Sequence, residues 1–377
     1  MDFPEEIITK ILKYVWAADK ASFERTAATS KIMRRISRDD LFKDCFKCQN
    51  CATLKSALEE DHLTCYKWHY NKITNANNNS LCIDASQAGS LKVVKFLVGL
   101  KKKNVPGHYG HALRLACFNG HLAVAKFLVL SGAKIHTGNH YPIRSASGHG
   151  HLDVVKFLVE SRADIHACDN DAIQLASKNG HVDVVKFLVG MGADIRAKRD
   201  LAVRQASQHG HLEVVKFLVS LGANIHAEDD YALRWASRIG HLEMVEFLFS
   251  SGANIHAEND FAIRIASEYG NLRVAEFLVE SGANIHSCNN YAIRAASQNG
   301  HLDVVKFLVE RGANIHAQND NSVRGASEKG HLEVVKFLVE SGANIHASND
   351  WAVQLASEYG HQDVVNFLVS LGAVVDT

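Results

Sequence analysis

Proline and long apolar runs are both scarce in this chain. Only three of the 377 residues are proline, which excludes long proline-rich linkers. No apolar run approaches the ~20 residues that a membrane-spanning helix needs, so we expect no contact with a membrane. The N-terminus, MDFPEEIITK, opens with acids and lacks the basic start and apolar run of a secretory signal peptide.

A net charge is also missing. The chain carries 41 basic and 41 acidic residues, so it has no bulk attraction to nucleic acid or to an anionic membrane. Its eight cysteines are spread along the chain and form no dense disulfide framework, which is typical of a reducing compartment. We therefore expect a cytoplasmic protein, in the host cell if the sequence is viral, and these observations do not exclude the nucleus.

Motifs for catalysis and cofactor binding are absent. The sequence contains no P-loop, no G-x-G-x-x-G and no H-E-x-x-H. Ser and His recur together only because a repeated unit contains both, and identical copies give no unique site. We predict that the chain is not an enzyme and has no cofactor and no metal.

A repeated unit is what the sequence does contain. The dipeptide Gly-His recurs with a constant spacing, and Gly270-Asn271 fills the single gap. The pairs stand at 120–121, 150–151, 180–181, 210–211, 240–241, 300–301, 330–331 and 360–361, which is a 30-residue period. We interpret residues 81–377 as ten units of this length, the last one truncated.

Each unit predicts two short helices and a turn. In the unit 291–320, the first helix (292–300) ends at Gly300, because glycine readily takes the left-handed conformation after a helix. The second helix (301–310) has an apolar stripe at i, i+3 and i+4 spacing that includes Leu302, Val305 and Val309. One such pair cannot bury its own apolar face, whereas stacked pairs can. We therefore predict an all-α solenoid.

The unit resembles the ankyrin repeat. The family pattern T-P-L-H-x-A-A-x-x-G-H-L-x-V-V-x-x-L-L-x-x-G-A-D is matched by 291–297, by Gly300-His301-Leu302 and by Gly312-Ala313-Asn314. Each unit is shorter than the family's by three residues, and the missing ones fall after Ala317. The resemblance therefore implies an ankyrin solenoid with a shortened hairpin. Such uniform 30-residue units look most like the ankyrin arrays of giant DNA viruses.

The ends of the array differ from its middle. Residues 51–80 align with the unit through His62-Leu63, and we interpret them as a degenerate first repeat. Near the C-terminus, Gln362 replaces a leucine that we expect to be buried, and Asn366 replaces a lysine. Polar replacements of this kind are typical of a terminal cap.

Residues 1–50 lack the period, and their first part resembles an F-box. The motif's start, L-P-x-E-I-x-x-x-I-L, is matched by Phe3-Pro4-Glu5-Glu6-Ile7 and by Ile11-Leu12, whereas Met33 stands where the family usually carries an aromatic residue. If the resemblance holds, it implies that a Skp-type adaptor of a cullin ubiquitin ligase docks on this helix. The residues expected to bind it are Phe3, Pro4, Ile7, Ile11 and Leu12. The alternative is a plain helical cap on the solenoid.

The cysteines and histidines raise the question of a metal site, and we interpret them as structural residues. Cys45 and Cys48, with His62 and Cys65, have the spacing of a zinc site. The repeat alignment already explains the second pair, so we favour packing as small apolar residues. Fifteen of the 22 histidines recur at two positions of the unit, where we expect hydrogen bonds to turn backbone.

A ladder of arginines recurs at position 4 of the unit. Its members are Arg114, Arg144, Arg204, Arg234, Arg264, Arg294 and Arg324. A basic stripe of this kind could follow phosphates, but acidic loops lie beside it in the sequence, as in EDD at 228–230. We therefore favour structural bonds to adjacent turns and expect no nucleic-acid partner.

Function is expected where the units differ. In ankyrin folds the short first helix lines the binding groove, and aromatic residues are frequent anchors of protein interfaces. The groove residues we predict are Tyr231, Trp235, Ile239, Phe261, Ile265, Tyr269, Tyr291 and Trp351. The alternative is that the aromatic residues at position 1 of each unit pack between units.

The resemblance thus implies a monomeric protein-binding module that recruits targets to a ubiquitin ligase. The rival hypothesis is a structural or decoy scaffold that sequesters a host protein without any ligase.

Overall fold

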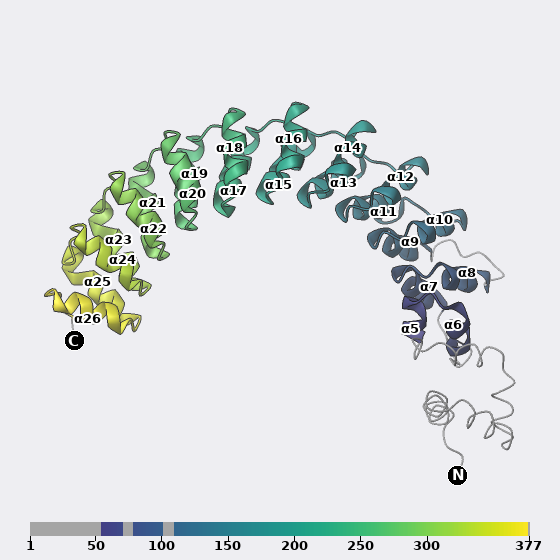
Figure 1. Cartoon of the computed structure of the whole chain (residues 1–377), viewed down its shortest axis with the longest axis horizontal. Coiled ribbons are helices and arrows are strands. Elements are labelled where there is room, and N and C mark those ends of the chain that lie inside the picture. Colours follow the sequence, from purple (N-terminus) through teal and green to yellow (C-terminus); the bar gives the residue numbers. More distant parts are fainter. Residues whose placement is uncertain (1–53, 71–77, 101–108, 376–377) are drawn as a thin grey trace, which may run out of the picture. The chain divides into compact units, whose positions relative to one another are not determined.

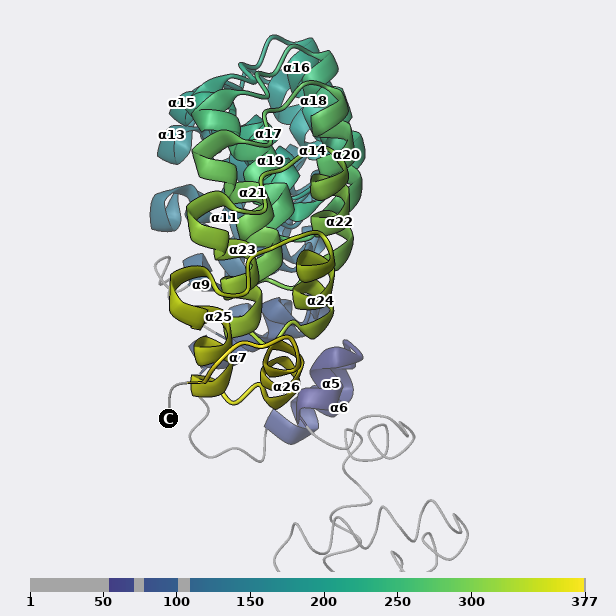
Figure 2. The same ribbon diagram turned by 90° about the vertical axis from the view of Figure 1, so that its left-hand side faces the viewer.

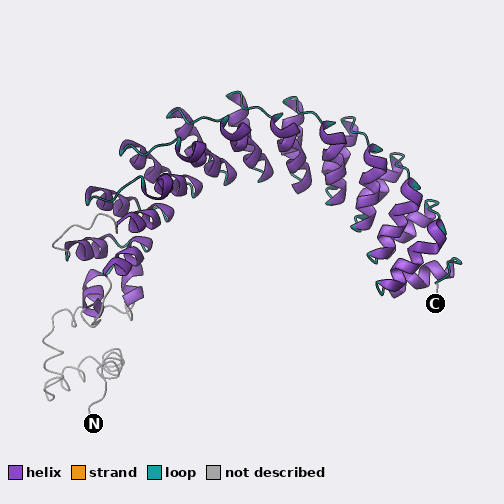
Figure 3. Cartoon of the chain, turned by 180° about the vertical axis from the view of Figure 1, so that it is seen from behind, coloured by secondary structure: helices purple, strands orange, loops and turns teal. Residues whose placement is uncertain are grey.

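The chain folds into a series of short helices joined by turns, as Figure 1 shows for a computed structural model of the protein. The structure describes residues 54–70, 78–100 and 109–375. The chain divides into two compact halves, Met1–Ala172 and Ile173–Thr377, which we call the first and the second half. Every regular element in the described ranges is a helix, and Figure 3 contains no strand there. The predicted all-α class is confirmed.

The first half contains four helix pairs and the start of a fifth. Its helices are α5 (Leu54–Glu59), α6 (Leu63–Tyr70), α7 (Asn78–Gln87), α8 (Leu91–Gly99), α9 (Tyr109–Phe118), α10 (Leu122–Leu130), α11 (Thr137–Gly148) and α12 (Leu152–Glu160). Helix α13 (Ala167–Lys178) spans the division. Within this half α7 contacts α9, α9 contacts α11, and α8 contacts α10.

The second half repeats the same pair six times after α13 and α14. Its helices are α14 (Val182–Gly190), α15 (Ala197–Gln208), α16 (Leu212–Ser220), α17 (Ala227–Ile239), α18 (Leu242–Ser250), α19 (Ala257–Glu268), α20 (Leu272–Glu280), α21 (Ser287–Gln298), α22 (Leu302–Glu310), α23 (Ala317–Glu328), α24 (Leu332–Glu340), α25 (Ala347–Glu358) and α26 (Gln362–Ser370). Figure 2 shows the first helices of each pair, α15 to α25, in one layer and the second helices, α16 to α26, in another.

The core lies between these two layers. In the unit 291–320 the first helix buries Ala292, Ile293 and Ala296, and the second buries Val304, Val305, Phe307 and Leu308. Leu302 and Val309 are only half-buried, so the apolar stripe that the sequence predicts is wider than the surface that packs. The same position holds Leu332 in a half-buried state, so the leucine that Gln362 replaces is not a core residue.

The glycine of each Gly-His pair connects the two helices of a unit. Gly300 has φ 78°, which is in the left-handed region that glycine reaches without strain. A Cβ atom at this position would lie 2.6 Å from the ring of His331 in the next unit. The glycine is therefore required twice, for the turn and for the close contact between neighbouring units.

A left-handed turn replaces the shortened hairpin that the sequence suggests. Lys198, Arg199 and Asp200 all have φ between 51° and 57°, and the corresponding three residues repeat this conformation in unit after unit. Three successive left-handed residues that are not glycine are costly, at roughly 1–2 kcal/mol each. Asn and Asp tolerate this conformation best, and they fill most of the last two of these positions.

The register changes by one position at the start of the array. His121 contacts Gly89 as His151 contacts Gly120, with the nearest ring atom 2.6 and 2.5 Å from the point where a Cβ of the glycine would stand. Gly89 and Gly120 are therefore equivalent, although the step between them is one position longer than the step from Gly120 to Gly150. The unbroken register begins with the unit 111–140, and not at residue 81.

The described residues do not settle two predictions about the N-terminal part. Helices α5 and α6 form a further pair, and Asp61 takes the left-handed position of the usual glycine with φ 46°. The interpretation of 51–80 as a degenerate repeat stays a prediction. The F-box-like residues Phe3, Pro4, Ile7, Ile11 and Leu12 lie outside the described residues, as do Cys45 and Cys48.

Candidate protein-binding surface

The turns are connected to one another by side chains of Asp and His. Asp230 is buried, and its Oδ1 accepts hydrogen bonds from His226 Nδ1 at 3.0 Å and from the backbone N–H of Asn254 in the next unit at 2.9 Å. The same pair of bonds recurs at Asp260 and at Asp320. Burial by itself would raise the pKa of Asp260, but the hydrogen bonds that its carboxylate accepts from Asn284, Ser287 and His256 together outweigh burial and lower it.

Both sets of histidines are structural. In the Gly-His pairs, His121, His151, His301 and His361 each donate Nε2–H to a carbonyl of the preceding unit at 2.9 Å, so the predicted backbone bond is confirmed for these residues. The Ile-His set, such as His226, bonds instead to the side chain four residues later. The backbone partner predicted for that set is wrong, because the left-handed turn brings the carboxylate or amide at its end back to the imidazole.

The arginine ladder bonds to the turns, as the sequence predicts. Arg234 donates to the backbone carbonyls of Glu228 and Asp229 at 2.7 and 2.8 Å, and Arg204, Arg264 and Arg294 repeat this pattern. These carbonyls belong to the left-handed residues. The guanidinium groups therefore satisfy backbone that the unusual turn leaves unpaired.

The aromatic residues at position 1 stack against this ladder. The Phe261 ring lies between Arg234 and Arg264, whose guanidinium carbons are 5.3 and 5.2 Å from its centroid. Tyr291 lies in the same way between Arg264 and Arg294. Tyr231 contacts Arg204 at 5.2 Å. Each ring thus contacts an arginine of the preceding unit, so these rings pack between repeats while one side stays in solvent.

Hydrogen bonds fix two of the tyrosines at position 1, Tyr231 and Tyr291. Tyr231 Oη donates to Gln208 Oε1 at 3.2 Å, and Tyr291 Oη donates to Glu268 Oε2 at 2.7 Å. The bond to Glu268 is the main cause that raises the pKa of Tyr291. Trp351 is different: it is 49% exposed and contacts only Arg324 among these arginines.

The remaining predicted residues cluster on two neighbouring helices. The ring of Trp235 on α17 packs against Tyr231 in a tilted arrangement, with 5.5 Å between the ring centroids. Ile239 at the end of α17 is 50% exposed, and Tyr269, which directly follows α19, is 44% exposed. Ile265 on α19 is half-buried. We call the set Tyr231, Trp235, Ile239, Phe261, Ile265 and Tyr269 the aromatic face.

Arg238 joins this face and was missing from the residues predicted to bind. Its guanidinium carbon lies 4.3 Å from the Trp235 ring centroid and 4.8 Å from that of Tyr269. One guanidinium nitrogen also donates to Tyr269 Oη at 2.6 Å. A signal for it was present in the sequence, since position 8 of the neighbouring units holds Gln208 and Glu268.

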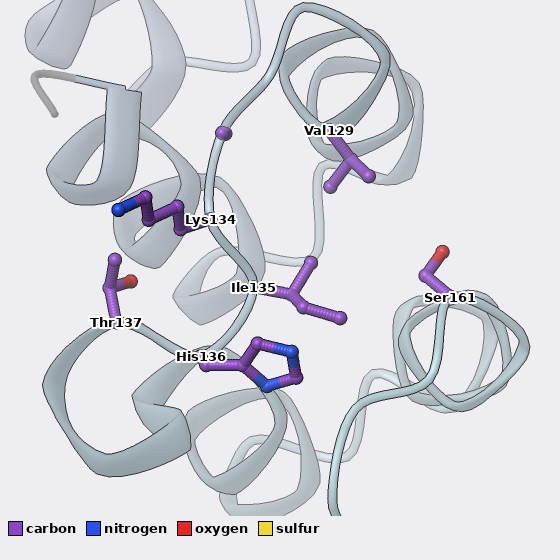
Figure 4. Close-up of a pocket in the computed structure, with 7 residues that line it drawn as sticks. Val129, Lys134, Ile135, His136, Thr137 and Ser161 are labelled. Carbon is purple, nitrogen blue, oxygen red and sulfur yellow. The ribbon is translucent and has the colours of Figure 1, made fainter. Parts of the chain in front are cut away.

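A separate hollow of about 360 Å³ opens beside the turn at Lys134–Thr137 in the first half. In Figure 4, Ile135 and the His136 ring point into it, with Val129 and Ser161 on its far side, while Lys134 points away. Its lining is mainly apolar, and it presents no array of polar groups that would orient a ligand. We therefore place the candidate site on the aromatic face.

Within the described ranges, no three His, Cys, Asp or Glu side chains are arranged to hold a metal ion, and no helix is long and apolar enough to cross a membrane. Cys65 is buried, and its backbone N–H donates to His62 Nδ1 at 3.3 Å. This pair therefore packs inside the helical array. The prediction that Cys45 and Cys48 pack as apolar residues and bind no zinc stays a prediction, because they lie outside these ranges.

Comparison with known proteins agrees with this geometry. No curated protein matches the chain. The family described as "Ankyrin repeats (3 copies)" matches residues 143–229, 204–289, 233–319 and 293–377, which together extend over more than half of the sequence. The stacked helix pairs occupy the same residues. The chain therefore belongs to the ankyrin-repeat family.

Proposed function

We propose that this protein binds a partner protein through the aromatic face on α17 and α19. Ankyrin repeats are protein-interaction modules, and the family match supports that coarse role. The observation that carries the proposal is the exposure of Ile239 and Tyr269 beside Trp235, where neighbouring units hold polar residues such as His209 and Asn299. Exposed aromatic and apolar residues beside an arginine have the composition of an interface hot spot.

The experiment is affinity capture with the full chain, followed by mass spectrometry. The variant Trp235→Ala/Ile239→Asn should weaken capture of the main partner by more than ~2 kcal/mol, a hot-spot magnitude. Phe249→Ala is the matched control, because Phe249 is a partly exposed aromatic residue on α18 that packs against Phe277. Equal capture by wild type and the double variant, with unchanged circular dichroism, would refute the binding role of this face.

We further propose that residues 1–46 attach the protein to a Skp-type adaptor, so that the repeats select targets for ubiquitination. The support is the match of Phe3-Pro4-Glu5-Glu6-Ile7 and Ile11-Leu12 to the start of the F-box. Pull-down with wild type and with Ile7→Glu/Ile11→Glu tests it. Adaptor capture that is lost only in the variant supports the ligase role. If wild type captures no adaptor, a scaffold or decoy that sequesters a host protein becomes the better proposal.

A further inference from the structure

Arg238 differs from the arginines of the ladder in what it bonds. Each of Arg204, Arg234, Arg264 and Arg294 donates to two backbone carbonyls of a turn. Arg238 instead bonds to Tyr269 Oη, and its buried Nε has no hydrogen-bond partner. No carboxylate of the described residues lies within ion-pair distance of it. Its charge is therefore not neutralised by a neighbour.

Two other cations of the second half do have such a neighbour. Lys329 pairs with Glu328 at 2.9 Å, and Arg311 lies 3.5 Å from Glu280. Glu268, an acid on the adjacent helix α19, accepts the Tyr291 hydroxyl at 2.7 Å. Among the described residues Arg238 is thus a cation without an ion pair, and it differs from the ladder arginines because its partners are two rings and a hydroxyl on the variable positions of the units.

The two rings fix the plane of the guanidinium. Trp235 and Tyr269 stack on it at 4.3 and 4.8 Å, and the hydrogen bond to Tyr269 Oη limits its rotation. A guanidinium held in this way loses little entropy when it binds, and its planar fork fits a carboxylate with two parallel hydrogen bonds. Ile239 offers an apolar contact next to it, since half of its surface is exposed.

We propose that the aromatic face binds a peptide segment in which an acidic residue stands beside an apolar one. The carboxylate pairs with Arg238, and the apolar side chain packs against Ile239 and Tyr269. This inference rests on the proposed function and specifies its partner. A carboxylate fits better than a phosphate dianion, because Arg234 and Arg264 are already committed to carbonyls and, of these three arginines, only the Arg238 guanidinium is left to bind an anion.

The test uses three immobilised pools of 12-residue peptides. Each pool has leucine next to a central residue that is glutamate, glutamine or phosphoserine, and all other positions are random. The full-length wild-type chain should bind the glutamate pool about tenfold more strongly than the glutamine pool, the difference expected for one charge-assisted hydrogen-bonded pair. Arg238→Leu should abolish this preference while circular dichroism stays unchanged.

Arg311→Leu is the matched control. Arg311 also stacks on a ring, Phe307 at 5.0 Å, but it follows a second helix, so its replacement should leave the preference intact. Equal binding of the glutamate and glutamine pools would overturn the inference, and the proposed function would stand if Trp235→Ala/Ile239→Asn still lost its captured partner. Stronger binding of the phosphoserine pool would overturn the inference in favour of a phosphopeptide partner. Failure of all three pools, with partner capture intact, would overturn it too.

Discussion

In the second half, the hydrogen bonds between successive turns repeat from unit to unit, whereas the residues of the aromatic face vary. We call the row of turns the turn edge. At the turn edge the same bond recurs with nearly the same length: the carboxylates of Asp200, Asp230 and Asp260 accept from a backbone N–H of the next unit at 2.7, 2.9 and 2.8 Å. On the first helices, positions 5, 8 and 9 differ from one unit to the next. Because stability in a repeat array comes from contacts between neighbours, recognition residues can vary without loss of the fold.

The largest expected effect lies at the contact that every unit repeats. Gly300→Ala places a Cβ in the left-handed region and 2.6 Å from His331, so we expect a loss of ~2–4 kcal/mol from backbone strain and overpacking. Gly312→Ala is the control in the same unit, because Gly312 has φ 86° and no neighbour within 4 Å of the added atom. Urea unfolding should show a loss of only ~1 kcal/mol for it. Equal losses would mean that the histidine contact contributes nothing.

A smaller loss of stability is expected when the hydrogen bond between two successive turns is removed. Asp230→Ala leaves the N–H of Asn254 without its acceptor, which should cost ~1–3 kcal/mol. Asp230→Asn should cost clearly less, because Asn290 already occupies the equivalent position and accepts from Asn314 at 2.9 Å. Thermal unfolding of the two variants measures the difference. A loss in Asp230→Asn as large as in Asp230→Ala would show that the charge, and not the hydrogen bond, stabilises the turn.

One substitution should stabilise the chain. Arg162 has φ 67° at a position where the other units have glycine, such as Gly132 and Gly192. Arg162→Gly should therefore raise the free energy of unfolding by ~1 kcal/mol. The reverse change, Gly192→Arg, is the control and should lower it by a similar amount, since nothing lies within 4 Å of a Cβ there. A decrease in stability for Arg162→Gly would contradict the strain argument.

A smaller effect on stability is expected from a change of pH alone. Burial lowers the pKa of His211 and of His331 below the ordinary value of 6.5, and neighbouring histidines add to the effect. Below pH 6.5 the unfolded chain then binds more protons than the folded one. The stability that the two neutral histidines contribute is therefore fully present above pH 6.5 and is lost as the pH falls through the folded pKa values.

The variant His211→Asn/His331→Asn isolates these two groups. Asn271 already replaces the histidine in one unit, where its Nδ2 donates to the Ser237 and Arg238 carbonyls at 2.9 and 2.7 Å. Urea midpoints between pH 7.5 and 5.5 should therefore fall less steeply for the variant than for wild type. Identical slopes would contradict the assigned pKa directions.

Replacing an exposed residue of the aromatic face should lower binding and leave stability nearly unchanged, unlike the changes above. Ile239→Asn introduces the residue that stands at this position in other units, as Asn179 and Asn299 do. We expect partner binding to fall while the free energy of unfolding changes by less than ~0.5 kcal/mol. A large loss of stability would mean that this face belongs to the framework.

The turn shows where prediction from the sequence failed. The three missing residues suggest a shorter hairpin, because the family pattern contains one. The repeated Asn and Asp at the ends of the turns, as in Asn259-Asp260, do signal left-handed backbone. The sequence predicts that the arginines bond to turns, but only the folded unit shows that the carbonyls Arg264 bonds, those of Glu258 and Asn259, belong to left-handed residues.

The sequence alone determined the period, the helix pairs and the family, because a stacked array depends on local apolar spacing and on contacts between adjacent units. It also located the variable positions, including Trp235 and Tyr269. Only the tertiary structure decided which polar groups are already satisfied. It separated the ladder arginines, which bond to backbone, from Arg238, whose charge is held between two rings without an acidic neighbour, since that difference arises from contacts between residues of different repeats.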